Sequence, residues 1–225
     1  MIKIIKKENY YYFLKNNKPL ITTSNNKIKV KDEKAANELS KYLILCFSSK
    51  SKVKNFFLKI LFFSFDLNKK KKQEIIENIL SFLNTDLVCY RAEKNSELDK
   101  TQTRLWSPLI AFVEEKYKFI FKVTNSIIPI QQREANKGKL LRILKKLNNH
   151  ELTSFYFITN FSNSNIITLN FLANNINSKN AWKVISLEEA YNLEKWGQDK
   201  EAKNKLLDKQ KHFNEIIKFS QLLKN

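Results

Sequence analysis

The sequence predicts an α+β protein, in which a small N-terminal β-meander/α unit is followed by a larger multihelical C-terminal domain. Two patterns lead to this prediction: short β-prone runs alternate with turns over residues 9–30, and helical periodicity continues from about residue 70 onward. With only 2 Gly and 3 Pro in 225 residues, Gly-rich phosphate loops and turn-dense small β modules are excluded. We therefore expect an N-terminal α/β domain with β-hairpins at residues 1–68 and a helical domain at residues 69–225.

The N-terminal elements are short runs of β-forming residues separated by Asn-rich turns. The runs occupy residues 10–14, 19–23 and 27–30, with Asn-Asn pairs between them. Asn tolerates the left-handed backbone that tight turns require, so Asn-Asn serves here as Asn-Gly does in ordinary compositions. Asp32 is positioned to cap a following helix, whose apolar residues recur at helical spacing as far as Phe47.

The most apolar stretch, residues 56–65, is interrupted by Lys59. It is shorter than the ~20 residues that a membrane-spanning helix needs. We therefore expect it to be a buried segment, with no membrane insertion.

The rest of the chain is predicted to be mainly helical. Residues 72–83 and 98–117 place apolar side chains on one face, and Pro108 is expected to break or restart the second helix. A short extended piece is expected at 119–123. Further helices are predicted at residues 139–147, 151–160, 166–175, 181–196 and 200–223.

The chain is strongly basic, with 41 Lys+Arg against 22 Asp+Glu and a formal net charge of +19. Nucleic acid is the obvious partner for such a charge. Nearly all the cations are lysines, however, accompanied by much Asn, Ile and Phe, as expected from an AT-rich coding sequence. The signatures of known nucleic-acid-binding modules are missing. We interpret the lysines as solvated faces, with no nucleic acid expected, and keep a basic nucleic-acid-binding module as the alternative function.

Patterns typical of catalysis or metal binding are also missing. The sequence has no G-x-S-x-G elbow, HExxH, Walker loop or GxGxxG, so no enzymatic activity, small-molecule substrate or cofactor is expected. Cys46 and Cys89 form no CxxC pair and, with His150 and His212, make no conventional zinc site. We expect reduced, buried thiols. The N-terminus resembles neither a secretion signal nor an organelle presequence, so we expect the protein to work where it is made.

Residues 186–202 carry a local charge of −3 in this basic chain. Gly197 follows Trp196 at an expected helix end, where a left-handed residue is needed before Asp199 caps the next helix. Two interpretations stay open: a helix–turn–helix corner with Trp196 in the core, and an acidic patch that binds a partner. The acids of this segment are Glu188, Glu189, Glu194, Asp199 and Glu201.

A second dense segment is residues 85–93, followed by Trp-Ser-Pro-Leu at 106–109. Asp86, Arg91 and Glu93 are expected to form a semi-buried ion-pair network that fixes a helix junction. A role in docking a partner is the alternative.

These segments make the chain resemble the ATP-twelve family, the assembly chaperones for the α subunit of the F-type ATP synthase catalytic head. The family run T-D-L-x-C-Y-R-A-E corresponds to residues 85–93, and its W-x-P-L helix to residues 106–109. The V-T-x-x-I-x-P run corresponds to residues 123–129, and E-x-W-G-x-D-x-E-A to residues 194–202. Over residues 31–82 only the helical pattern matches.

The resemblance implies a non-enzymatic chaperone that binds the newly made α subunit and masks its β-facing surface until the β subunit arrives. It implies that Glu194, Asp199 and Glu201 contact the client and that Trp196 and Gly197 shape the site. Architectural roles are implied for Asp86, Tyr90, Arg91, Glu93, Trp106 and Pro108. A monomer is expected, in a bacterial cytoplasm, or in the mitochondrial matrix if the chain is eukaryotic.

Overall fold

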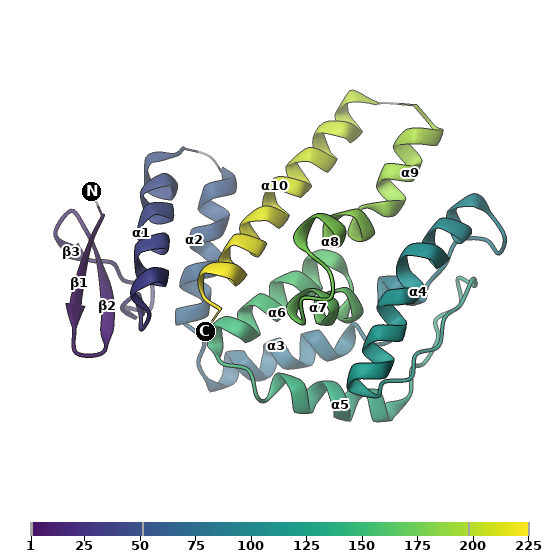
Figure 1. The fold of residues 1–225 in the computed structure, drawn as a ribbon, viewed down its shortest axis with the longest axis horizontal. Helices are drawn as coiled ribbons and strands as arrows, with labels where there is room; N and C mark the ends of the chain where they lie inside the picture. Colours follow the sequence, from purple (N-terminus) through teal and green to yellow (C-terminus); the bar gives the residue numbers. More distant parts are fainter. Residues whose placement is uncertain (1, 51, 198, 225) are drawn as a thin grey trace. The chain divides into compact units, whose positions relative to one another are not determined.

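Figure 1 shows the computed structural model of the chain, which describes residues 2–50, 52–197 and 199–224. The fold is α+β, as predicted: a small antiparallel sheet at the N-terminus is followed by helices. The chain forms two compact units. Unit 1 comprises residues 1–72, 147–154 and 214–225, and unit 2 comprises residues 73–146 and 155–213. The expected domain division at residue 68 stays a prediction.

The sheet of unit 1 is built on a hairpin of β1 (Ile2–Lys7) and β2 (Tyr10–Lys15). β2 also pairs with β3 (Lys18–Pro19) and β4 (Lys29–Val30), all antiparallel. The sequence prediction missed β1, where β-branched Ile residues at positions 2, 4 and 5 favour a strand. The turns confirm the role expected for Asn, because the backbone φ angles are positive at Asn16, Asn17 and Asn25.

Helices α1 (Glu33–Ser48) and α2 (Lys52–Phe65) complete the N-terminal part of unit 1. The Asp32 carboxylate accepts the Ala35 N–H at 2.7 Å, so the predicted cap of α1 is confirmed. The apolar stretch lies within α2, which buries Phe57 and neighbouring aliphatic residues. Among the described residues, no helix combines the length and apolar character needed to cross a membrane.

The long helix α4 (Glu97–Tyr117) packs against α7 (Asn165–Leu172) in unit 2. The expected break at Pro108 is wrong, because α4 continues through this residue. Pro108 cannot donate a backbone hydrogen bond, but α4 is stabilised on both sides of it by the buried side chains of Trp106 and Leu109.

The other predicted helices are present, but α5 (Glu134–Leu144) begins and ends earlier than the predicted helix 139–147, and one helix is divided. The extended piece expected at 119–123 forms no strand. The predicted helix 181–196 is divided into α8 (Ser178–Ile185) and α9 (Leu187–Lys195). The division falls at Ser186, whose hydroxyl donates to the Trp182 carbonyl oxygen at 2.8 Å. The remaining helices are α3 (Lys69–Ser81), the 3-10 turn η1 (Leu87–Cys89), α5 (Glu134–Leu144), α6 (Asn149–Ser162) and α10 (Lys200–Leu222).

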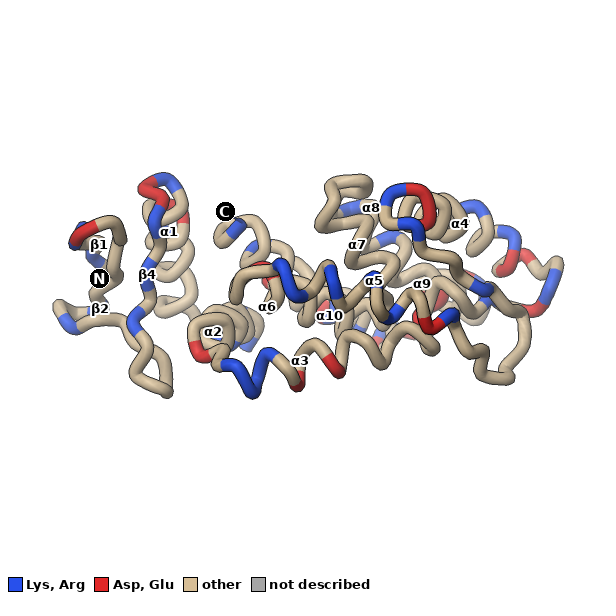
Figure 2. The backbone as a smooth tube through the Cα atoms, turned by 90° about the horizontal axis from the view of Figure 1, so that it is seen from below, with Lys and Arg blue, Asp and Glu red and all other residues tan. Residues whose placement is uncertain are grey.

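The charged residues are distributed over both units, as Figure 2 shows with Lys and Arg in blue and Asp and Glu in red. Blue positions occur along strands and helices of the chain. Both cysteines are free and buried, so the expected state of these thiols is confirmed. Burial raises the pKa of Cys46 to about 12, which keeps this thiol protonated and unreactive at neutral pH.

Candidate functional site

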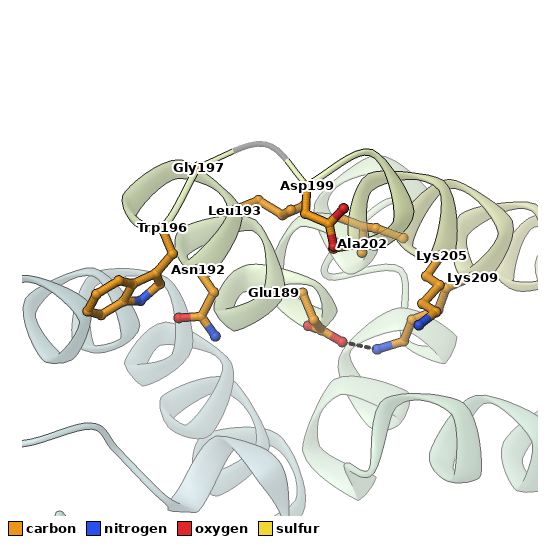
Figure 3. Close-up of a pocket in the computed structure, with 10 residues that line it drawn as sticks. Glu189, Asn192, Leu193, Trp196, Gly197, Asp199, Ala202, Lys205 and Lys209 are labelled. Carbon is orange, nitrogen blue, oxygen red and sulfur yellow. Dashed lines mark hydrogen bonds and ion pairs between the residues drawn. The ribbon is translucent and has the colours of Figure 1, made fainter.

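The acidic segment forms a helical hairpin in unit 2, made of α9 and the first half of α10 (Figure 3). We call residues 187–209 the arm. The backbone N–H of Trp196 donates to the Asn192 carbonyl oxygen and closes α9. Gly197 follows with φ +93°, in the left-handed region that favours glycine. The expectation of a left-handed residue at this helix end is therefore confirmed.

Trp196 lies at the tip of the arm and is 87% exposed. The interpretation that placed Trp196 in the core is wrong. Trp196 is exposed because it follows the last residue of α9, at the end of the helix that points away from the core. The buried residue of α9, Leu187, lies at the other end of the helix. An indole in water leaves a large apolar area unburied, which is typical of a side chain that a partner covers.

A hollow of about 470 Å³ lies between α9 and α10. Leu193 and Leu206 give it an apolar wall, and Trp196 lies at its edge (Figure 3). The Lys209 ammonium group pairs with the Glu189 carboxylate along the side of the hollow, as the dashed line in Figure 3 marks. The hollow is therefore an apolar surface bordered by charge, with room for side chains of another protein.

The carboxylates of the arm differ in their contacts. Asp199 accepts the Glu201 N–H at 3.0 Å at the start of α10, which confirms its predicted role as a cap. Glu201 pairs with Lys205 at 2.6 Å, and both side chains are more than 70% exposed. Asp199 borders the large hollow, whereas Glu194 borders a second hollow of about 320 Å³. The hairpin thus presents its acids on more than one side.

A polar connection joins the arm to the first turn of α4. The Lys195 ammonium group lies 2.5 Å from the Glu97 carboxylate, and the Tyr191 hydroxyl donates to the same group at 3.4 Å. The contact with Lys195 lowers the pKa of Glu97. All of these groups are accessible to water. The Lys195–Glu97 ion pair therefore contributes little to stability, and its main effect is to orient the arm.

Asp86 is completely buried in unit 2 and does not form the expected ion pair. Its carboxylate accepts the Ser164 hydroxyl at 2.6 Å, the Ile166 N–H at 3.1 Å and the Val88 N–H at 3.2 Å. Burial raises the pKa of Asp86 to about 6, although these hydrogen bonds favour the charged form. Asp86 therefore joins η1 to the N-terminus of α7 by capping both.

Arg91 contacts other groups than those predicted. Its guanidinium group donates to the Gln102 carbonyl oxygen at 2.7 Å and lies 5.1 Å from the centre of the Trp106 ring. Trp106 is fully buried, and its indole N–H donates to the Val184 carbonyl oxygen at 3.1 Å. Glu93, the third member of the expected network, is exposed. The ion-pair prediction is therefore corrected: one backbone carbonyl and an aromatic face take the place of carboxylates as partners of Arg91.

Tyr90 connects two separate parts of unit 2. Its hydroxyl donates to the Asn84 carbonyl oxygen at 2.5 Å and accepts the Ile130 N–H at 3.2 Å.

Among residues 2–50, 52–197 and 199–224, no three His, Cys, Asp or Glu side chains come together as a metal site.

Comparison with known proteins gives a family match over the first half of the chain. A sequence model of the ATP12 chaperone protein family matches residues 2–114. The chain belongs to the ATP12 chaperone family. The family match includes Asp86, Arg91 and Trp106, and the resemblance seen in the sequence is confirmed. The arm lies C-terminal to the matched residues.

Solved structures extend the likeness in fold to nearly the whole chain. Atp12 from Paracoccus denitrificans has a TM-score of 0.85 at 20% sequence identity, over 98% of this chain and 95% of that chain. A proposed chaperone from Agrobacterium tumefaciens has a TM-score of 0.87 at 21% identity, over 99% of this chain and 84% of that one. At such identities the likeness shows the shared fold.

Sequence reasoning missed the hollow of this ATP12 family chain, although it found the acids beside it. Ala202 and Leu206 are four residues apart on α10, a spacing that normally indicates a core face, and Leu193 lies across from them on α9. All three are partly exposed, because within the described residues the arm has few neighbours to cover them.

Proposed function

We propose that this member of the ATP12 chaperone family binds the free α subunit of the F-type ATP synthase and masks its β-facing surface until the catalytic head assembles. Subunits of an obligate ring expose large apolar interfaces before assembly and aggregate through them. A chaperone that binds such a surface protects it by mass action, without catalysis, cofactor or metal.

The observation that carries this proposal is the exposed Trp196 beside an apolar hollow bordered by acids. Trp is among the residues that contribute most to binding when an interface buries them. Acids at the border of such a contact orient the partner and select against the wrong one. We therefore assign the client contact to the arm, with Glu194, Asp199 and Glu201 as its charged part.

We propose that the protein acts as a monomer in a bacterial cytoplasm, or in the mitochondrial matrix if the chain is eukaryotic. Both compartments are reducing, in agreement with the free, buried thiols of Cys46 and Cys89.

Charge variants of the arm test the proposal. We expect Glu201→Lys and Asp199→Asn to weaken binding of the purified α subunit about tenfold or more, because each removes a carboxylate from the contact. The Asn variant keeps an oxygen that can cap α10, so its stability should stay near that of the wild type. Titration calorimetry measures the binding, and thermal unfolding followed by circular dichroism measures the stability.

The matched control is Glu74→Lys, a charge reversal at an exposed position of α3 in the same unit. It should leave binding unchanged. Equal loss of binding in Glu74→Lys and Glu201→Lys would attribute the effect to net charge, and loss of the fold in Glu201→Lys would assign the acid a structural role.

A further inference from the structure

The segment that joins α4 to α5, residues 118–133, carries an apolar tip that lies in water. Ile127 is 99% exposed and Ile128 is 70% exposed. Ile120 and Val123, earlier in the same segment, are 45% and 46% exposed. Single exposed apolar residues are common, but adjacent isoleucines this open are typical of a surface that another molecule covers.

Two buried side chains, one near the end of this segment and one from α5, bind its backbone. The Gln132 carboxamide, itself buried, accepts the Lys122 N–H and donates to the Lys122 carbonyl oxygen, both at 2.9 Å. Buried Asn136 binds both backbone groups of Ile120 in the same way, at 3.2 and 2.8 Å. The segment is irregular, yet the backbone N–H and carbonyl groups of Ile120 and Lys122 are paired, which restrains the conformation of this part of the segment.

The tip itself is shaped by two consecutive hydroxyl turns. The Thr124 hydroxyl accepts the Ser126 N–H at 3.0 Å, and the Ser126 hydroxyl accepts the Ile128 N–H at 3.0 Å. Pro129 follows and fixes its own φ angle. A tip prepared in this way loses little conformational entropy when a partner binds.

The tip and the arm are attached to the same place in unit 2, the first turn of α4. The Asn125 carboxamide, next to the tip, donates to the Asp99 carboxylate at 3.0 Å. Two residues earlier in α4, Glu97 pairs with Lys195 of the arm. A protein of ordinary size bound at the arm therefore comes close to the tip as well.

We propose that Ile127 and Ile128 form a second contact for the α subunit, by inserting into an apolar pocket on the surface of this client. The inference rests on the proposed function and adds a second, apolar contact to the acidic arm. The client surface that the chaperone masks is destined for a subunit interface, and such interfaces contain apolar pockets.

The test compares two double variants in binding to the purified α subunit. Ile127→Ser with Ile128→Ser should weaken binding at least ~10-fold, because the apolar contact is lost. The control, Ile44→Ser with Leu45→Ser, changes two residues of α1 that are 46% and 54% exposed. It should stay within ~2-fold of the wild type. A photo-crosslinking amino acid at position 127 of the otherwise unchanged chain should also crosslink to the α subunit.

The possible failures are distinguishable. If the wild type binds the α subunit and the Ile127/Ile128 double variant binds equally well, the tip makes no contact and the inference is overturned while the proposed function stands. Binding without a crosslink at position 127 has the same meaning. If the wild type does not bind the α subunit, the proposed function and the inference both fall.

Discussion

Trp196 is the single residue whose substitution best tests the proposed client contact, because the sequence pattern allowed both a core and a surface position for it. We predict that Trp196→Ala weakens α-subunit binding by about 2 kcal/mol or more, as expected of an anchoring aromatic residue. The free energy of unfolding should change little, because the indole is 87% exposed in the free protein. Calorimetry and urea unfolding measure the two quantities. A loss of stability without a loss of affinity would return Trp196 to a structural role.

Asp86 makes the stability of unit 2 dependent on pH. Its pKa of about 6 lies above the 3.8 of an unfolded chain, so the folded state keeps a proton that the unfolded state has already lost. The stability it contributes is complete below pH 4 and is lost as the pH rises through 6. We predict that, between pH 4 and pH 7, the free energy of unfolding of the wild type falls by on the order of 1–3 kcal/mol relative to that of Asp86→Asn, as measured by urea unfolding. Parallel profiles of the two proteins would contradict this.

The titration of His150 changes stability with pH in the opposite direction to that of Asp86. The wild type is therefore compared with Asp86→Asn at each pH. Burial lowers the pKa of His150 to about 4, below its ordinary value of 6.5. Its ring lies 4.8 Å from the ring of Phe65, and its Nδ1 is 3.0 Å from the Ser64 hydroxyl. The stability it contributes is present above pH 6.5 and is lost as the pH falls through 4. The raw pH profile of the wild type therefore sums opposing slopes, which the Asp86→Asn difference separates.

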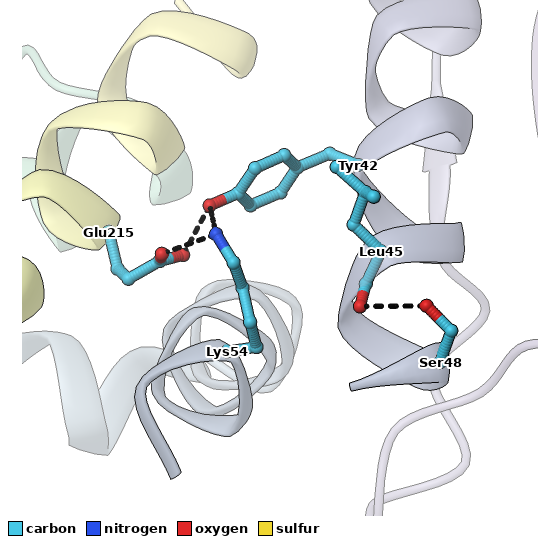
Figure 4. A network of polar contacts seen from close by, with 5 residues as sticks. All are labelled: Tyr42, Leu45, Ser48, Lys54 and Glu215. Carbon is cyan, nitrogen blue, oxygen red and sulfur yellow. Dashed lines mark hydrogen bonds and ion pairs between the residues drawn. The ribbon is translucent and has the colours of Figure 1, made fainter. Parts of the chain in front are cut away.

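At the scale of elements, a polar network joins α1, α2 and the last part of α10 in unit 1 (Figure 4). Lys54 donates to the carboxylate of Glu215 at 2.7 Å and to the hydroxyl of Tyr42 at 2.6 Å. Tyr42 donates in turn to Glu215 at 2.5 Å. The Glu215 side chain is only 5% exposed, so it depends on these two partners.

We predict that Lys54→Met destabilises the protein by about 2–3 kcal/mol, less than the ~3–5 kcal/mol typical of a fully buried pair. The reduction follows from Lys54, whose side chain is 29% exposed and partly solvated. Adding Glu215→Gln should recover much of the loss, because it removes the unpaired buried charge. Urea unfolding of both variants measures these changes, and a double variant no more stable than Lys54→Met would contradict the account.

The elements that depend on local chemistry could be predicted from the sequence. The Asp32 cap, the left-handed Asn turns and the amphipathic α3 and α4 each follow from residues close together in the chain. The continuity of α4 through Pro108 could not, because it depends on the burial of Trp106 against α8, far away in the sequence.

The candidate site on the arm was predictable only in those features that residues close together in the chain determine. A run of acids in a basic chain is visible from composition, and Gly197 at a helix end is a local signal. Whether Trp196 is buried depends on which element covers the arm, and the sequence does not state that. The exposed position of Ile127 was not predictable for a similar reason: the hydroxyl groups of Thr124 and Ser126 shape the backbone around it through hydrogen bonds that no periodicity reveals.

For the whole molecule, we predict that the net charge of +19 serves as solvated surface. Lys and Arg occur along strands and helices in both units (Figure 2), and the sequence lacks the signatures of known nucleic-acid-binding modules. Membership of a chaperone family and the exposed apolar groups of unit 2 favour a protein partner over the basic nucleic-acid-binding module.

Co-expression with its proposed client tests whether this chain protects the free α subunit. We would express the chain with the α subunit and, separately, with the β subunit of the ATP synthase of the same organism. The soluble fraction of each subunit and its recovery with the tagged chain are then measured. We expect the α subunit to be recovered and kept soluble, and the β subunit not to be. Recovery of neither subunit by a well-folded chain, or recovery of β alone, would contradict it.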